Sequence, residues 1–189
     1  MVLFFPLYPQ NDPQHRATLL NKNTNKTKLV TLQYPNAIYS SDYYLQFTIS
    51  TCKKTADGTI YLGTNHGLCT AQYNGESVTI KPTNIRNNDV INSILDSTKP
   101  HHLILATDLG LYEVDLLTKT EIQLQKGSFL SLFRYPIGWV AGSRQAGAYF
   151  FDNNNRLLRQ LNTDNGLNSN TVYSILYDHK FYTIWLGTG

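Results

Sequence analysis

The sequence has 189 residues, of which 41% are hydrophobic and 12% aromatic, and its formal net charge is +3. This composition excludes a disordered chain, and no apolar run approaches the roughly 20 residues that cross a bilayer. The densest basic stretch, formed by Lys22, Lys26 and Lys28, is diluted by Asn and Thr, which favours a solvated loop over a nucleic-acid site. The 13 tyrosines, with frequent Thr, Ile, Val and Phe, favour β-strands.

The chain begins with an apolar stretch, residues 1–8 (MVLFFPLY), which no basic segment precedes. Two interpretations remain open for this stretch: the remnant of a clipped signal peptide, and an edge strand of the fold. We therefore separate residues 1–41, as an N-terminal segment, from the repeat that follows.

Two cysteines, Cys52 and Cys69, are too few for a disulfide framework and lack CxxC spacing. A bridge between them remains an alternative in an oxidising compartment. We expect two small buried thiols instead.

Four short segments share a pattern of apolar or aromatic residues followed by a small one: 60–63 (IYLG), 103–106 (LILA), 138–141 (GWVA) and 184–187 (IWLG). The small residues are separated by about 43, 35 and 46 residues, close to the length of a propeller blade. We expect the small residue to let neighbouring backbones approach near the propeller axis. We expect the bulky residues before it, such as Trp139 and Trp185, to pack between neighbouring sheets.

A hairpin that contains glycine follows the small residue. Residues 65–68 (NHGL) match 108–111 (DLGL), and the third copy has Gly147 at a slightly longer spacing. Glycine supplies the positive φ that turns the chain back beside itself. Around these hairpins the pattern predicts lead-in strands at 47–50, 89–95, 131–133 and 170–176, returning strands at 68–73, 111–115 and 148–152, and fourth strands at 77–81, 121–125 and 157–161.

Each repeat is thus a four-stranded antiparallel meander, the unit of a propeller blade. The sequence predicts an all-β protein, a partial β-propeller with about three complete four-stranded antiparallel blades plus part of a fourth. The blades are expected at about 42–84, 85–126, 127–162 and 163–189. Because these blades cannot close a ring of the usual four to eight, we expect a fragment of a longer propeller, with completion by a partner chain as the alternative.

The stretch 165–178 (NGLNSNTVYSILYD), followed by 184–188 (IWLGT), resembles the two-component regulator propeller repeat. Residues 89–115 are a second good match, and 42–75 and 128–155 are weaker ones, so the resemblance spans roughly residues 42 to 189. The chain departs from the repeat where Ala106 and Ala141 replace the glycine of the motif, and Trp occurs in only two of the four copies.

This resemblance implies the periplasmic input region of a bacterial hybrid two-component receptor. In such receptors the propellers precede a transmembrane helix, a histidine kinase and response elements, and the typical cue is a glycan fragment. We therefore expect a non-catalytic, ligand-sensing propeller fragment. Its partner would be a small molecule or an oligosaccharide, and its parent receptor a homodimer. The alternatives are a protein-interaction propeller of the kelch or WD40 kind, and a propeller-type hydrolase or lyase fragment.

The histidines show no spacing typical of a metal site or an active site; they are His15, His66, His101, His102 and His179. Adjacent residues on an extended chain point to opposite sides, so His101 and His102 make a poor metal pair. The sequence contains no HExxH, GxSxG or P-loop motif.

Several carboxylates fall at predicted turns or strand ends, where capping of the turn explains them: Asp57, Asp96, Asp115, Asp152 and Asp178. We therefore predict no catalytic residue, no metal, no cofactor and no nucleic-acid partner. Ligand contacts are expected from the loops between blades, where the repeat does not constrain the residues, and the sequence does not identify them.

Overall fold

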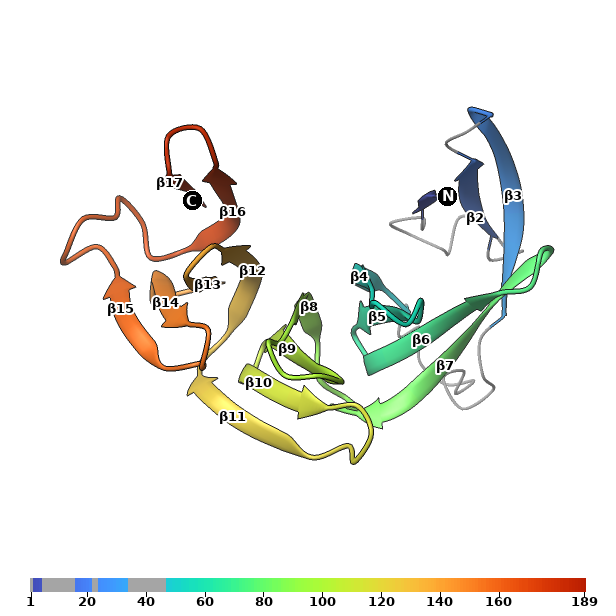
Figure 1. Ribbon diagram of the computed structural model, residues 1–189, viewed down its shortest axis with the longest axis horizontal. Helices are drawn as coiled ribbons and strands as arrows, with labels where there is room; N and C mark the ends of the chain where they lie inside the picture. The colour runs from blue at the N-terminus through green and yellow to red at the C-terminus, as the bar shows by residue number, and fades with distance from the viewer. Residues whose placement is uncertain (1, 5–15, 22–23, 34–46) are drawn as a thin grey trace. The chain divides into compact units, whose positions relative to one another are not determined.

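The computed structural model describes residues 2–4, 16–21, 24–33 and 47–189. These residues form strands and connecting turns, and the chain divides into two compact units, Met1–Asn88 and Asp89–Gly189. Within the described part of the chain, there is no helix long and apolar enough to span a membrane. The predicted all-β class is confirmed, as are the four-stranded antiparallel meanders (Figure 1). That these meanders are blades of a longer β-propeller stays a prediction.

The first unit is one seven-stranded sheet in the order β1-β2-β3-β7-β6-β5-β4. Its last four strands form the predicted meander, and β3 joins that meander through a parallel pairing of residues 31–33 with residues 77–79. The strands are β1 (Val2–Phe4), β2 (Arg16–Asn21), β3 (Lys26–Gln33), β4 (Ile49–Lys54), β5 (Ile60–Thr64), β6 (Gly67–Tyr73) and β7 (Ser77–Ile85).

One side of this sheet carries the core of the first unit. Leu62 and Ile80 are fully buried there, and Val30 and Leu32 of β3 pack in the same cluster. The N-terminal segment thus contributes apolar side chains of β3 to this core, whereas the sequence had left open only an edge strand there. Within the apolar stretch 1–8, Val2–Phe4 forms β1 at the sheet edge, and the rest lies outside the described residues.

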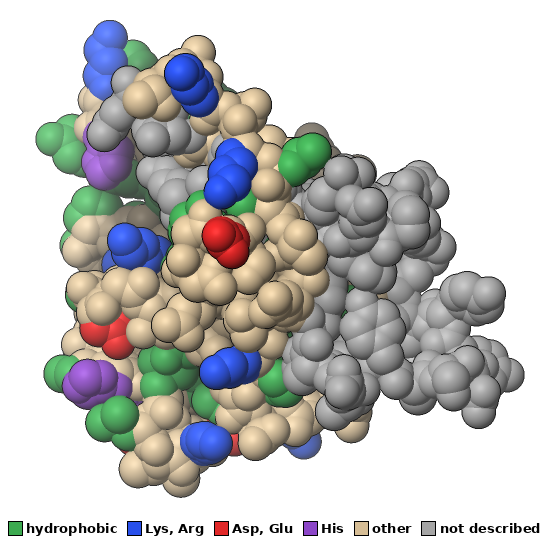
Figure 2. Space-filling model, turned by 90° about the vertical axis from the view of Figure 1, so that its right-hand side faces the viewer, with side chains coloured by type: hydrophobic (Ala, Val, Ile, Leu, Met, Phe, Trp, Pro, Cys, Tyr) green, Lys and Arg blue, Asp and Glu red, His purple; other side chains and the backbone are tan. Residues whose placement is uncertain are grey.

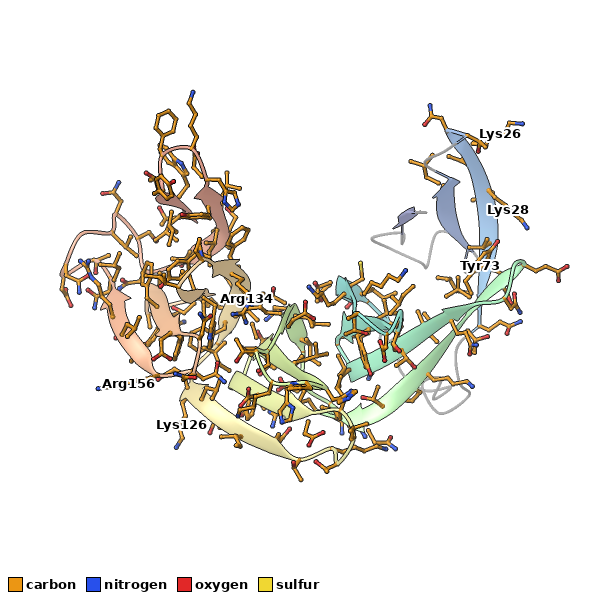
Figure 3. All side chains as sticks on the ribbon, in the orientation of Figure 1. Lys26, Lys28, Tyr73, Lys126, Arg134 and Arg156 are labelled. Carbon is orange, nitrogen blue, oxygen red and sulfur yellow. The ribbon has the colours of Figure 1, made fainter. Side chains whose placement is uncertain are left out.

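The loop predicted for the basic stretch is wrong at Lys26 and Lys28, because both residues belong to strand β3. Both side chains are exposed, because residues 26–29 of β3 are all exposed and burial begins at Val30. Lys28 Nζ donates to the carbonyl of Gly75 at 2.9 Å, and Tyr73 Oη donates to the same oxygen at 2.7 Å (Figure 3). This contact ties β3 to the turn between β6 and β7. Lys22 lies outside the described residues.

The second unit contains two complete meanders and a hairpin. We call the sheet β8–β11 blade 2, the sheet β12–β15 blade 3 and the hairpin β16–β17 blade 4. Their strands are β8 (Ile91–Asp96), β9 (His102–Thr107), β10 (Gly110–Asp115), β11 (Glu121–Lys126), β12 (Phe129–Tyr135), β13 (Gly138–Ser143), β14 (Ala148–Asp152), β15 (Leu157–Leu161), β16 (Val172–Asp178) and β17 (Thr183–Thr188).

Blades 2, 3 and 4 pack face to face in chain order, because each meander buries apolar residues on both sides. β12 lies against β8 and β9, and β16 lies against β12 and β13. Trp139 is 0% exposed at the junction of blades 2 and 3, where its ring stacks on Phe151 with centroids 4.1 Å apart. The inter-sheet packing predicted for Trp139 is confirmed.

The packing predicted for Trp185 stays a prediction: its side chain is 59% exposed, on the side of β17 that faces away from blade 3. Alternate residues of β17 face blade 3, so Ile184 and Leu186 are partly buried while Trp185 points to the other side of the hairpin. No described residue covers that side. Trp139 therefore corresponds to Ile184 in the repeat, and not to Trp185.

The repeat in blade 3 is displaced by one residue from its predicted register. The small residue that pairs with the lead-in strand is Gly142, opposite Ser131, as Gly187 is opposite Ser174 in blade 4. Gly142, not Ala141, thus corresponds to Gly63 and Ala106, and the spacings become about 43, 36 and 45 residues. The predicted close approach is confirmed at Gly142, where an added Cβ would lie 2.6 Å from the Val172 carbonyl oxygen.

Both cysteines are free, with Cys69 buried and Cys52 exposed. The expectation of two buried thiols is therefore wrong for Cys52, which lies on β4 at the edge of the sheet. Both residues pair with Leu62, one from each side. Two strand spacings, about 10 Å, then separate them, and this distance is too long for a disulfide.

We expect a thiol reagent to modify one cysteine in the native protein and the second only after denaturation. Burial raises the pKa of the Cys69 thiol, and the thiolate is the reactive form. Intact-mass spectrometry after labelling with and without urea measures both events. The Cys52→Ser variant is the control, and fast native labelling of that variant would contradict the burial of Cys69.

Candidate functional site

The loops that join the second and third strands of each blade are built on a buried hydroxyl group. Thr107 Oγ1 accepts hydrogen bonds from the N–H groups of Leu109 and Gly110 at 3.0 and 3.1 Å. Ser143 Oγ accepts from the N–H of Ala146 at 2.7 Å, and Thr64 has the same place in the first unit. These hydroxyl groups fix the loop backbones, so the side chains on the loops start from defined positions.

The residue that follows each of these threonine or serine residues donates a backbone hydrogen bond to the segment that leads into the same blade. The N–H of Asp108 donates to the Val90 carbonyl at 3.2 Å, and the N–H of Arg144 donates to the Ser128 carbonyl at 2.9 Å. Hairpin loops and lead-in segments therefore lie at the same edge of each blade. We call it the loop edge.

At the loop edge of the second unit, polar side chains from blades 2 and 3 converge. Asp108 Oδ1 accepts from Asn92 Nδ2 at 3.0 Å and from Ser128 Oγ at 3.1 Å. Arg144 Nη2 lies 3.4 Å from the same carboxylate oxygen, and Arg144 Nε donates to Ser128 Oγ at 3.2 Å. Thr171, from the lead-in of blade 4, donates to the Arg144 carbonyl at 2.7 Å. We call these five residues the loop-edge cluster.

The loop-edge cluster is accessible and chemically mixed. The side chains of Arg144 and Asp108 are 48% and 38% exposed, so part of each charged group remains free to meet a ligand. Carboxylate, amide and guanidinium groups are planar and can each form two hydrogen bonds at fixed geometry. Such a set suits a ligand rich in hydroxyl groups.

Two tyrosine–glutamine pairs support the loops from the outer strands. Gln160 Nε2 donates to Tyr149 Oη at 3.0 Å and to the Ala146 carbonyl at 2.7 Å. Gln123 makes the same pair of contacts with Tyr112 and the Leu109 carbonyl in blade 2. Burial raises the pKa of Tyr149, so its hydroxyl stays neutral.

The sequence did not identify the loop-edge cluster or its supports. A signal for the supports was present, because Tyr112 and Gln123 recur as Tyr149 and Gln160 at the same offset. The cluster itself left no such signal, since its residues differ in type from blade to blade.

The predicted turn-capping role of the aspartates is confirmed at four of the five positions. The carboxylates of Asp115, Asp152 and Asp178 accept from backbone N–H groups of the turns that follow them, and Asp57 binds Thr55 and Thr59. These hydrogen bonds lower the pKa of Asp57 and Asp115 and hold both carboxylates ionised. Asp96 instead offers its backbone carbonyl to Arg134.

In the described part of the chain, no group of three His, Cys, Asp or Glu residues could hold a metal ion. His66 stacks on Phe47, His179 lies edge-on to Tyr177, and His102 contacts the Pro100 carbonyl and Asp115. His15 lies outside the described residues. The lysine and arginine side chains visible in Figure 2 stand apart rather than in one patch.

Comparisons with known proteins give a fold but no family. No family model matches the chain, and no curated protein matches it either. The resemblance to the two-component regulator propeller repeat therefore stays a prediction.

Solved structures do match. The extracellular domain of BT4673 from B. thetaiotaomicron, described in two structures as a one-component and as a hybrid two-component system, is 20% identical. The first of these structures aligns with a TM-score of 0.65 over 92% of this chain and 24% of that chain. The extracellular domain of the hybrid two-component system BT3049 from the same organism is also 20% identical, with a TM-score of 0.63 over 91% of this chain and 22% of that chain. This chain thus spans about a quarter of the length of the structures it matches, and it shares their fold.

Proposed function

We propose that this chain is the ligand-sensing part of the extracytoplasmic input region of a bacterial two-component receptor. The observation that carries the proposal is its structural similarity, over 92% of its length, to an extracellular domain of such a system. The repeat resemblance in residues 165–188 supports the same assignment independently of that similarity.

The proposed activity is binding without catalysis, with a glycan fragment as the cue. The loop-edge cluster supports this proposal, because its groups are half exposed and already hydrogen-bonded to one another. Vicinal hydroxyl groups of a sugar could replace these internal bonds with little loss. Binding would act on the receptor only through a difference in affinity between two states. A periplasmic location and a homodimeric parent receptor belong to the same proposal.

We expect an oligosaccharide from a panel of neutral and uronate-containing glycans to bind, and Arg144→Gln to weaken that binding by about 10- to 100-fold. Arg144 is chosen because it contacts Asp108 and Ser128 and lies beside Thr171. Isothermal titration calorimetry on the purified chain measures both constants.

The matched control is Arg156→Gln. Arg156, labelled in Figure 3, is exposed in the turn between β14 and β15, whereas Arg144 lies in the loop between β13 and β14, at the other end of β14. Arg156→Gln should leave the affinity unchanged. If no glycan of the panel binds, the proposal of a glycan cue is contradicted. If both variants weaken binding equally, the loop-edge cluster is not the binding site.

A further inference from the structure

The edge of blades 2 and 3 opposite the loop edge contains a buried carboxylate. Glu113 is 3% exposed on β10, between buried apolar neighbours along the strand. A carboxylate in such a place is destabilising unless hydrogen bonds and an opposite charge compensate it.

Each oxygen of Glu113 has a partner from the turn between β8 and β9. Ser97 Oγ donates to Oε1 at 2.6 Å, and Lys99 Nζ donates to Oε2 at 2.6 Å. Burial alone would raise the pKa of Glu113, but the hydrogen bonds from Lys99 and Ser97 and the charge of Lys99 outweigh it and lower the pKa. Glu113 is thus an anion held in place by its own blade.

Asn155 lies in the turn between β14 and β15 of blade 3, where its Oδ1 accepts from Trp139 Nε1 at 3.0 Å. The Asn155 side chain also contributes to lowering the pKa of Glu113. Asn155 has a φ of 64°, a left-handed conformation that costs most residues about 1 kcal/mol or more. We call Ser97, Lys99, Glu113, Trp139 and Asn155 the junction network.

Further contacts join the same two turns across the junction. Thr98 Oγ1 donates to the Asn153 carbonyl at 2.9 Å. Arg134 on β12, labelled in Figure 3, donates to Asn153 Oδ1 at 3.0 Å and to the backbone carbonyl of Asp96. At the corresponding edge between blades 3 and 4, the rings of Tyr135 and Tyr177 lie near each other, with centroids 6.4 Å apart.

We propose that the junction network is a lock that holds blade 3 against blade 2, and that it opens when Glu113 loses its charge. Among the described residues, Lys99 is the charged group in contact with Glu113, and Arg134 from β12 is directed to a carbonyl and an amide instead. The lock does not depend on ligand binding at the loop edge. The junction between blades 2 and 3 then has two arrangements, one with the network formed and one with it open. A change of receptor state requires two such arrangements.

The direction of the pH effect follows from the lowered pKa. Stability from Glu113 is fully present above its ordinary pKa of about 4.5 and is lost as the pH falls through the folded value. Trp139 reports the event directly, because its indole N–H binds Asn155. The chain has two tryptophans, so Trp185→Phe leaves Trp139 as the sole emitter.

In the Trp185→Phe background we expect Trp139 emission to shift to the red in one step below about pH 4.5, while far-UV circular dichroism keeps its strand signal. Glu113→Gln should remove this step. Asp164→Asn, at an exposed loop position of the same unit, should keep it. A step that persists in Glu113→Gln, or that coincides with loss of the strand signal, would overturn the lock.

A second pair of variants tests the network without removing the charge. Asn155→Gly keeps the left-handed backbone and removes the amide, so Trp139 emission should already be red-shifted at neutral pH. Lys119→Gly is the matched control, since Lys119 has a φ of 60° in the equivalent turn of blade 2. Equal emission from the two variants would contradict the proposal even where Glu113→Gln does not fold.

Discussion

Replacing Gly147 by alanine is expected to lower the free energy of unfolding of the second unit by about 3–5 kcal/mol. Gly147 has a φ of 82° in the loop between β13 and β14, and an added Cβ would overlap the carbonyl oxygen of Leu161. That oxygen belongs to backbone, so the strand must move. Gly147 also donates to the Asn170 carbonyl at 2.8 Å and accepts from the Ser143 N–H at 2.9 Å, and movement would break both bonds. Urea denaturation followed by circular dichroism measures the loss.

Gly58→Ala separates backbone conformation from the clash. Gly58 has a φ of 90°, close to that of Gly147, but nothing lies within 4 Å of an added Cβ. Its substitution should lower stability by about 1 kcal/mol, the conformational cost alone. A similar loss in both variants would mean that the Leu161 carbonyl yields easily, which would contradict the tight packing of the hairpin on β15.

The repeat was readable from the sequence because its turns depend on local chemistry. Glycines with positive φ, such as Gly67, Gly110 and Gly147, mark the hairpins wherever the chain must return beside itself. The returning strand predicted at 111–115 is observed at Gly110–Asp115 for this reason.

The register of blade 3 was not readable, since Ala141 and Gly142 both satisfy the rule of a small residue. The strand pairing decides between them: Gly142 lies opposite Ser131, and Ser131 directly follows the bulge of its strand. Thr51, Ser93 and Ser174 have the same position in the other blades, opposite Gly63, Ala106 and Gly187. Pattern matching alone therefore placed Trp139 one position too far along the repeat.

The hairpin β2–β3 was missed for a related reason. Its loop has no glycine, and Asn25 adopts the left-handed conformation with a φ of 53°. Asparagine does so readily, but an Asn- and Lys-rich stretch is also typical of a solvated loop.

The loop-edge cluster and the junction network lay beyond prediction, since both arise where different blades meet. Asp108 and Arg144 occupy the same repeat position, 36 residues apart, but have opposite charges. Glu113 reads as a surface residue until Lys99 and Asn155 are brought to it. The repeat consists of the residue types that the blades share. Residues that differ in type between blades, such as these, therefore cannot be recognised from it.

Trp139→Ala is the second substitution with a large expected effect, a loss of about 3–5 kcal/mol in the free energy of unfolding. The indole is 0% exposed, stacks on Phe151 and donates to Asn155 at 3.0 Å. Alanine would leave a cavity between blades 2 and 3 and remove the donor that Asn155 accepts from. Urea denaturation with circular dichroism again gives the measurement.

Trp185→Ala is the matched control, because it removes the same side chain from a position that is 59% exposed. It should change the free energy of unfolding by less than about 1 kcal/mol. An equal loss in the two variants would mean that the side of blade 4 carrying Tyr173, Leu176 and Trp185 is covered in solution. Dependence of that loss on protein concentration would then identify a second copy as the cover, since a monomer's stability does not change with dilution.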